Sequence, residues 1–236
     1  MQLSDFTTLT FDCYGTLIDW ESGMLKALTP LTDRLPNELT TNAILEAHGK
    51  HEAAQEAQTP AMIYSDLLAV VYKRMAEEWG VSASWEESVT YGESVKDWPA
   101  FPDSADALKY LKEHYKLVIL SNVDNRSFAA SNAKLGVEFD AIYTAQDIGS
   151  YKPSDNNFSY MLRNIITLGI EKSDILHTAE SLFHDHVPAN RHGLKSCWIY
   201  RRHDKDGFGA TQNPGEMPQV DFQFTSMAEM AQVHQG

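Results

Sequence analysis

Reactive side chains stand at four points where the sequence predicts that a buried strand ends. A carboxylate, a hydroxyl beside an amide, a lysine and a pair of carboxylates follow the four strands in turn. These residues are Asp12, Ser121 with Asn122, Lys152, and Glu180 with Asp185. A single carboxylate after a strand is usual for a helix cap or a turn. Four reactive groups at successive strand ends instead indicate one reaction site.

Asp12 is the candidate nucleophile. A free aspartate titrates near ~3.9, so its side chain is ionised at neutral pH. As a carboxylate it can split one displacement into an ester-forming step and a hydrolytic step. Lys152 would supply a fixed positive charge that keeps Asp12 ionised and neutralises charge on a substrate. Asp185 is the candidate for orienting or activating the water that cleaves the ester.

The residues expected to bind the substrate are hydrogen-bond donors and aromatic rings. Thr16, Ser121 and Asn122 offer donors that could hold an anionic group. Backbone N–H groups in the turn after the first strand could help them. Tyr14 and Trp20 could form an aromatic wall whose positive ring edges accept a halide, although burial is the more usual role of such rings.

Apolar segments alternate with helical ones, which predicts a parallel sheet covered on both faces. The sequence predicts strands at residues 6–12, 116–120, 141–143, 175–177, 196–200 and 221–225. It predicts helices at residues 104–114, 125–135, 156–168 and 188–192, the last three closed by Gly136, Gly169 and Gly193. Ligands of such sheets bind beyond the carboxyl ends of the strands, which is where the reactive groups stand.

Between Trp20 and about Trp98 the spacing of apolar residues becomes helical, and no strand-like run interrupts it. We therefore predict an α/β fold: a doubly wound parallel sheet whose chain leaves after the first strand, builds a helical cap and returns. The predicted core comprises residues 1–19 and 99–236, and the predicted cap residues 20–98.

Composition excludes several classes of protein. The 236 residues suit one large domain, or a domain with an insert, and the net charge is −14. The only basic cluster spans residues 195–205, so no nucleic-acid partner is expected. Two cysteines build no disulfide framework, and residues 1–15 lack the charged and apolar regions of a secretory signal. No apolar run approaches the ~18 residues that span a bilayer.

These observations lead us to expect a cytoplasmic enzyme with a small anionic substrate and no membrane partner. A homodimer formed through cap surfaces rich in Leu and Tyr is one option. A hydrophobic cap face could equally close over the reaction site.

The four motifs resemble those of the haloacid dehalogenase superfamily. The matching segments are 11–17 (FDCYGTL), 120–122 (LSN), 151–153 (YKP) and 180–185. The position of the cap directly after the first motif is also similar, so the resemblance covers nearly the whole chain. It implies a Rossmann-like core and a covalent aspartyl intermediate at Asp12.

The identity of residue 14 helps to distinguish the phosphatases of this superfamily from its dehalogenases. The phosphatases of the superfamily share an Asp-x-Asp motif, and its second Asp protonates the departing alkoxide. In this sequence Tyr14 occupies the position of that second Asp. A phenol with a pKa near ~10 is a much weaker acid, whereas a halide leaves without a proton. The Asp-x-Tyr-Gly-Thr pattern is similar to that of the L-2-haloacid dehalogenases, which use no metal. We therefore predict a 2-haloacid dehalogenase-like hydrolase without a cofactor.

Two departures from that pattern keep alternatives open. The similar dehalogenases place an Arg of the cap over the halide. Between positions 35 and 72 this sequence has no Arg and only one Lys, Lys50. The site could therefore open another activated C–X bond of a small carboxylate, including a strained C–N ring. Glu180 stands at the position where the similar dehalogenases carry Ser or Asn. With Asp12 and Asp185 it could instead bind Mg²⁺ in a phosphatase. Retention of all four motifs argues against an inactive binding module.

Overall fold

The predicted apolar segments form one six-stranded parallel sheet in the order β3-β2-β1-β4-β5-β6. The computed structural model describes residues 1–236. Its strands are β1 (Thr8–Phe11), β2 (Lys116–Ser121), β3 (Ala141–Thr144), β4 (Ile175–Ala179), β5 (Lys195–Ile199) and β6 (Phe222–Phe224). Because the chain order reverses beside β1, the residue after that strand, Asp12, lies at the switch point where such sheets bind ligands.

The sheet is covered on both faces, as predicted. In β2, Leu117 and Ile119 belong to one hydrophobic cluster and Val118 and Leu120 to the other, the period of two that a strand imposes. The first face carries α5 (Ser104–Lys112), α6 (Asn125–Leu135) and α10 (Met227–Gln235); the second carries α8 (Asp155–Ile165) and α9 (Val187–Arg191). The structure therefore confirms a doubly wound α/β core.

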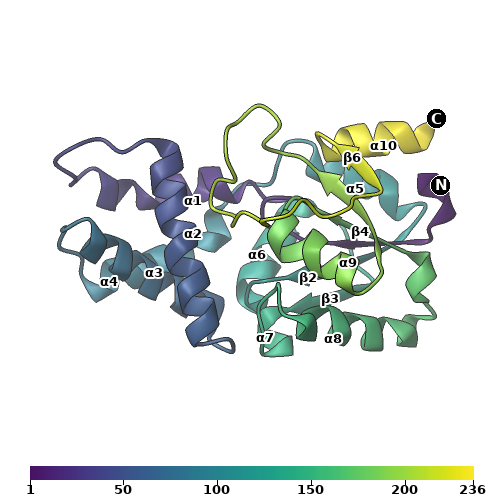
Figure 1. The fold of residues 1–236 in the computed structure, drawn as a ribbon, viewed down its shortest axis with the longest axis horizontal. Coiled ribbons are helices and arrows are strands. Elements are labelled where there is room, and N and C mark those ends of the chain that lie inside the picture. The colour runs from purple at the N-terminus through teal and green to yellow at the C-terminus, as the bar shows by residue number, and fades with distance from the viewer.

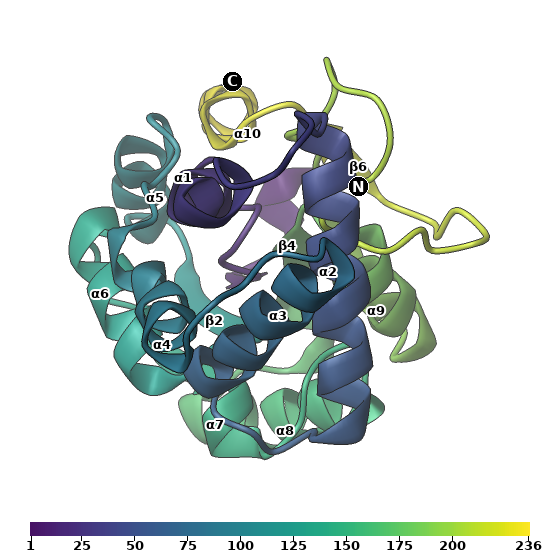
Figure 2. The ribbon, with the colours of Figure 1, turned by 90° about the vertical axis from the view of Figure 1, so that its left-hand side faces the viewer.

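A helical cap is inserted between β1 and β2 (Figures 1 and 2). It consists of α1 (Trp20–Thr32), α2 (Thr41–Gln58), α3 (Tyr64–Glu78), α4 (Trp85–Gly92) and a 3-10 helix (Glu93–Asp97). The chain enters and leaves it through paired backbone, with bridges from Tyr14 to Ile18 and from Ile18 to Ala100. The cap boundaries at residues 20 and 98 stay a prediction.

Several short elements were not predicted from the sequence. The helix α7 (Ala145–Ile148) and the π-helical turn Leu182–His186 are too short for periodicity to reveal. The helix α10 was detectable, because Ser226 and Glu229 have the spacing of a capping pair and Ser226 accepts a hydrogen bond from the Glu229 N–H. Further 3-10 turns are Leu3–Asp5, Ile166–Leu168 and Lys172–Asp174. None of the helices combines the length and apolar composition needed to cross a lipid bilayer.

The loop after β5 fastens the cap to the core. Arg202 of this loop donates to Glu21 of α1 at 2.7 Å and to Asn42 of α2 at 3.3 Å. Arg202 and Glu21 are both buried, so losing either partner would leave a buried charge unpaired. The same loop lays the carbonyl of Ala210 against Gly49 of α2, where a Cβ atom would overlap the carbonyl oxygen.

We predict that Gly49→Ala destabilises the protein. In an ordinary helix interior this substitution adds about 1 kcal/mol of stability. Here the methyl group would displace the backbone of the loop, and overpacking of this kind costs about 1–3 kcal/mol. Urea unfolding would measure the change. A more stable Gly49→Ala variant would show that the loop does not press on α2.

Candidate active site

Asp12 lies just beyond β1 and is held from both sides. Its Oδ1 accepts a hydrogen bond from Lys152 Nζ at 2.9 Å, and its Oδ2 accepts one from Thr16 Oγ1 at 2.9 Å. The Asp12 side chain is almost fully buried. Burial raises the pKa of Asp12, while the Lys152 ammonium opposes that shift. The carboxylate is thus fixed at the end of the central strand.

Lys152 is the cation that joins the site together. Its Nζ donates to Asp12 Oδ1, to Asp185 Oδ1 at 2.6 Å and to the carbonyl oxygen of Leu120 at 2.9 Å, which uses all three ammonium protons. Burial would lower the pKa of Lys152, but the two carboxylates outweigh it and raise the pKa. Lys152 is 1% exposed, so a permanent buried positive charge faces two carboxylates.

Asn122 holds the backbone of Lys152. Its Oδ1 accepts from the Lys152 N–H at 2.7 Å, and its Nδ2 donates to the Lys152 carbonyl at 3.0 Å. The sequence suggested Asn122 as a donor to substrate. In this structure its amide is mainly occupied in connecting the end of β2 to the lysine loop.

Asp185 lies in the turn after β4 and is held by two partners. Besides Lys152, its Oδ1 contacts Nε2 of His177 at 3.0 Å, and the other ring nitrogen of His177 contacts Thr10 Oγ1 at 2.8 Å. Burial alone would raise the pKa of Asp185, but Lys152 and His177 hold it well below its usual range. Asp185 is therefore a permanent anion, and its buried Oδ2 accepts no hydrogen bond.

The Tyr14 hydroxyl is engaged away from Asp12. It contacts Ser131 Oγ at 2.7 Å and donates to the Ser127 carbonyl at 3.3 Å, both on α6. Burial raises the pKa of Tyr14 well above its ordinary value. Because its proton is held by α6 and is weakly acidic, Tyr14 is a poor proton donor to a leaving group.

One small cavity brings most of the predicted residues together. Asp12, Tyr14, Trp20, Asn122, Lys152 and Asp185 all line it. Ser181 and His184 of the motif segment 180–185 also line it. The remaining polar lining residues, which no sequence motif indicated, are Glu52, Glu56, Tyr64 and Thr211. The cavity holds about 40 Å³, room for only one or two water molecules. Residues of both the cap and the core line the cavity, so it lies between the two.

Three predicted residues do not line this cavity. Thr16 lies beside Asp12, and its hydroxyl also accepts from the Glu180 N–H at 2.9 Å. Ser121 is buried with no partner for its hydroxyl. Glu180 lines a separate cavity with Trp198 and Tyr200.

The residues named for Mg²⁺ do not fit a metal site. No three His, Cys, Asp or Glu side chains converge closely enough to hold an ion. Between Asp12 and Asp185 lies the Lys152 ammonium, paired with both. Glu180 lines a separate cavity, and burial raises its pKa to about 8.

Glu52 and Glu56 of α2 are the cap's contribution to the cavity. Glu52 Oε1 accepts from the Tyr64 hydroxyl at 2.7 Å, and Glu56 Oε1 accepts from Asn122 Nδ2 at 3.4 Å. Burial raises the pKa of Glu52 to about 7. Burial and the neighbouring Glu52 raise the pKa of Glu56 well above its ordinary value. The cap therefore presents a pair of carboxyl groups to Asp12.

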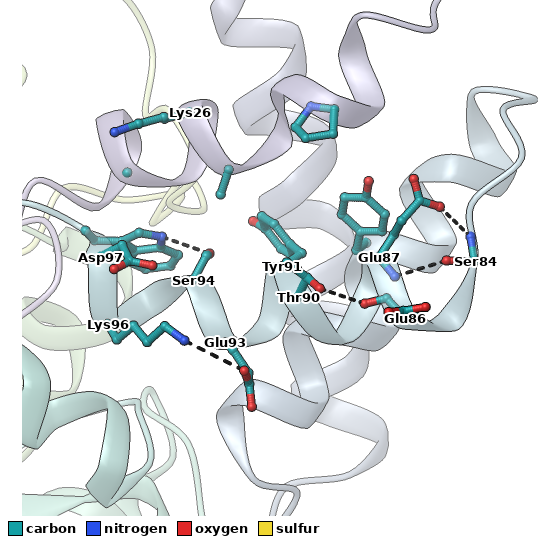
Figure 3. A pocket seen from close by; sticks show the side chains of 15 residues that line it. Lys26, Ser84, Glu86, Glu87, Thr90, Tyr91, Glu93, Ser94, Lys96 and Asp97 are labelled. Atoms are coloured by element: carbon teal, nitrogen blue, oxygen red, sulfur yellow. Dashed lines mark hydrogen bonds and ion pairs between the residues drawn. The ribbon is translucent and has the colours of Figure 1, made fainter.

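A much larger cavity, of about 770 Å³, lies elsewhere (Figure 3). It opens within the cap between α1 and the segment of α4 and the following 3-10 helix. Its polar residues pair with one another, as Ser84 does with Glu87 and Lys96 with Glu93. It shares no lining residue with the Asp12 cavity, so size does not identify the reaction site here.

We predict that Glu52→Gln becomes more stable relative to wild type as the pH rises. A pKa raised from 4.5 to about 7 means that the folded wild type binds a proton that the unfolded chain has released. Wild-type stability from this group is therefore lost as pH rises through the folded pKa, by about 2 kcal/mol between about pH 5 and about pH 8.

Urea unfolding of both proteins across that range measures the difference. Glu46→Gln, an exposed position on the same helix, is the matched control. Parallel pH profiles for wild type and Glu52→Gln would show that Glu52 is ionised as readily in the folded state as in the unfolded chain.

Comparison with known proteins places this geometry in a family. Residues 6–178 match the model of the haloacid dehalogenase-like hydrolases. A search of curated protein sequences finds no significant match. Among solved structures, the defluorinating L-2-haloacid dehalogenase Rha0230 aligns with a TM-score of 0.79 and 19% identity, covering 100% of this chain and 98% of that one.

Two further structures share the fold. The L-2-haloacid dehalogenase from Xanthobacter autotrophicus aligns with a TM-score of 0.79 at 16% identity, covering 98% of this chain and 99% of that one. The HAD-hydrolase YfnB from Bacillus subtilis, solved with bound magnesium, aligns with a TM-score of 0.75 at 17% identity and the same coverage. At these identities the alignments establish the fold alone. The family match over residues 6–178 shows that this chain belongs to the haloacid dehalogenase-like hydrolases.

Proposed function

We propose that this hydrolase attacks the α-carbon of a small carboxylic acid with Asp12 and displaces the leaving group as in a 2-haloacid dehalogenase. The observation that carries the proposal is the pairing of an Asp12 carboxylate fixed by Lys152 with a Tyr14 hydroxyl turned to α6. A nucleophile is present, and the residue at the position that would protonate an alkoxide is a phenol whose hydroxyl is held by α6. This combination suits a leaving group that departs without an added proton.

The reaction proceeds in two steps. An Asp12 oxygen forms a bond to the α-carbon while the carbon–halogen bond breaks and halide takes its electron pair. Water then attacks the carbonyl carbon of the Asp12 ester. One of its protons passes to the departing alkoxide, which gives the 2-hydroxy acid, and the other passes to solvent, which restores the carboxylate. Lys152 balances the charge of Asp12 throughout. Asp185 Oδ2, which has no hydrogen-bond partner, is the acceptor available to orient that water.

A relative supports covalent chemistry in this fold. The dehalogenase from Xanthobacter autotrophicus has also been solved with chloropropionic acid covalently bound. In this protein the corresponding ester would form at Asp12, the carboxylate that lies at the end of β1 in the cavity under the cap.

A second candidate is cleavage of a strained C–N bond next to a carboxylate. It is favoured by the lack of a cap cation at the cavity. Lys50, the only Lys or Arg between positions 35 and 72, pairs with Glu78 at 2.7 Å on the surface. The cavity lining contains no Arg or Lys other than Lys152. A magnesium-dependent phosphatase is the weaker alternative, because its three carboxylates do not converge.

We predict that Lys152→Met lowers the rate at least about 10²-fold, the scale of losing an electrostatic partner at a reacting centre. An ion-release assay on chloro-, bromo- and fluoroacetate beside aziridine- and azetidine-2-carboxylate and phosphomonoesters, with and without EDTA, identifies the substrate for this measurement. Lys50→Met, which removes an exposed lysine, is the control and should keep the wild-type rate. A near-wild-type rate for Lys152→Met would place the lysine outside the mechanism.

We also predict that ¹⁸O from water enters the Asp12 side chain during one turnover. The product hydroxyl then comes from Asp12 and is unlabelled, since water attacks the ester carbonyl rather than the substrate carbon. Mass spectrometry of the peptide containing Asp12 detects the label, and Asp12→Asn, which lacks the nucleophile, should show neither label nor turnover. Labelled phosphate released only with Mg²⁺, with Asp12 unlabelled, would establish a phosphatase instead.

A further inference from the structure

The cap helix α2 presents two carboxyl groups to the Asp12 cavity. Glu52 and Glu56 are one helical turn apart, so both side chains lie on the same face of α2. They are only 6% and 9% exposed. Both line the cavity that contains Asp12 and Lys152. Buried acidic residues on the reactive side of a cap require compensation, because burying an unpaired charge is strongly unfavourable.

The protein itself supplies little of that compensation. Each carboxyl accepts a single hydrogen bond through its Oε1, and neither Oε2 atom accepts one. The nearest basic group, Nδ1 of His48, lies 3.9 Å from Glu52 Oε2, and burial lowers the pKa of His48 to about 3, which leaves it neutral. No lysine or arginine forms an ion pair with Glu52 or Glu56.

The balance of charges in the cavity is one-sided. Asp12, Asp185, Glu52 and Glu56 bring four carboxyl groups, and Lys152 brings the only ammonium. That ammonium already donates to Asp12 and Asp185. Asp185 Oδ2 in the same cavity is fully buried and without a partner. Once ionised, Glu52 and Glu56 would repel a substrate with only negative charge, whereas a bound cation would attract them and stabilise their ionised forms.

We propose that Glu52 and Glu56 form a subsite for a protonated amine, so that the substrate is a small amino carboxylate. This inference rests on the proposed function, because it assigns the substrate class of the Asp12 site. The rings of Trp20 and Tyr64 line the same cavity and can contact a cation through their faces. The substrate carboxylate would then lie at the opposite end of the cavity, near the positive charge of Lys152.

This subsite also suits a reaction without a general acid. When the protonated nitrogen is the leaving atom of a small ring, Asp12 bonds to carbon and the C–N electron pair passes to nitrogen. The nitrogen keeps its protons and departs as a neutral amine, so no further proton is needed from Tyr14. When the amine is a bystander, the pair only orients the substrate and halide departs as before.

A pair of unreactive ligands tests the subsite. L-Proline and cyclopentanecarboxylate have the same ring size and the same carboxylate, but only proline carries a positive charge. Calorimetric titration of the wild-type protein at about pH 8, where more of the Glu52 carboxyl is ionised, should show proline binding at least about 10-fold more tightly. Proline binding should also release protons, seen as a dependence of the heat on the buffer.

The variants isolate the two carboxyls. Glu52→Gln with Glu56→Gln keeps the shapes and the acceptors of both side chains, and it should abolish the preference for proline while leaving cyclopentanecarboxylate binding unchanged or tighter. Glu46→Gln, exposed on the same helix, should keep the preference. Thermal melting checks folding, and the single variant Glu56→Gln serves if the double variant does not fold.

Equal affinity for the two ligands in wild type, binding of neither, or a preference that survives in the Gln variant would each overturn the subsite. Labelling of Asp12 tests the proposed function separately. A proline preference without Asp12 labelling would leave the subsite standing and remove the ester mechanism. Labelling by a halogenated acid without any proline preference would do the reverse.

Discussion

The structure depends on one buried arrangement of charge: the Lys152 ammonium between the carboxylates of Asp12 and Asp185. Three ionised groups are withdrawn from water at a single point, which is strongly unfavourable unless each finds partners. The partners come from different strands. Thr16 holds Asp12 from the turn after β1, and His177 of β4 holds Asp185. The parallel sheet is the framework that brings these segments to one edge.

The cap adds a second set of acidic groups, which are stabilised in a different way. The core carboxylates are neutralised by a cation of the protein, whereas Glu52 and Glu56 are satisfied only by a hydroxyl and an amide. Of the core carboxylate oxygens, only Asp185 Oδ2 is buried without a partner. The cap site is incomplete, and its energy depends on what enters the cavity or on the protons that the carboxyls retain.

The core part of the site could be predicted from the sequence because its reactive residues follow recognisable apolar strands. Asp12, Lys152 and Asp185 each follow an apolar run, and the topology of a parallel sheet then brings them together. The cap residues could not be found in this way. Glu52 and Glu56 stand in a polar, Ala-rich helix whose inward face depends on how α2 packs. The direction of the Tyr14 hydroxyl depends on α6, more than 100 residues away. His177 could have been suspected from the sequence, because it is a polar residue within a buried strand.

The paired backbone at the entrance of the cap has an evolutionary consequence. The bridges from Tyr14 to Ile18 and from Ile18 to Ala100 hold the two ends of the inserted segment beside each other. Domain insertion is tolerated where the ends of the inserted chain lie close together. The helices between them can thus be exchanged or rebuilt by mutation without redirecting β1 or β2. Descent from one ancestral core can in this way yield enzymes that retain the Asp12 chemistry while acquiring new selectivity.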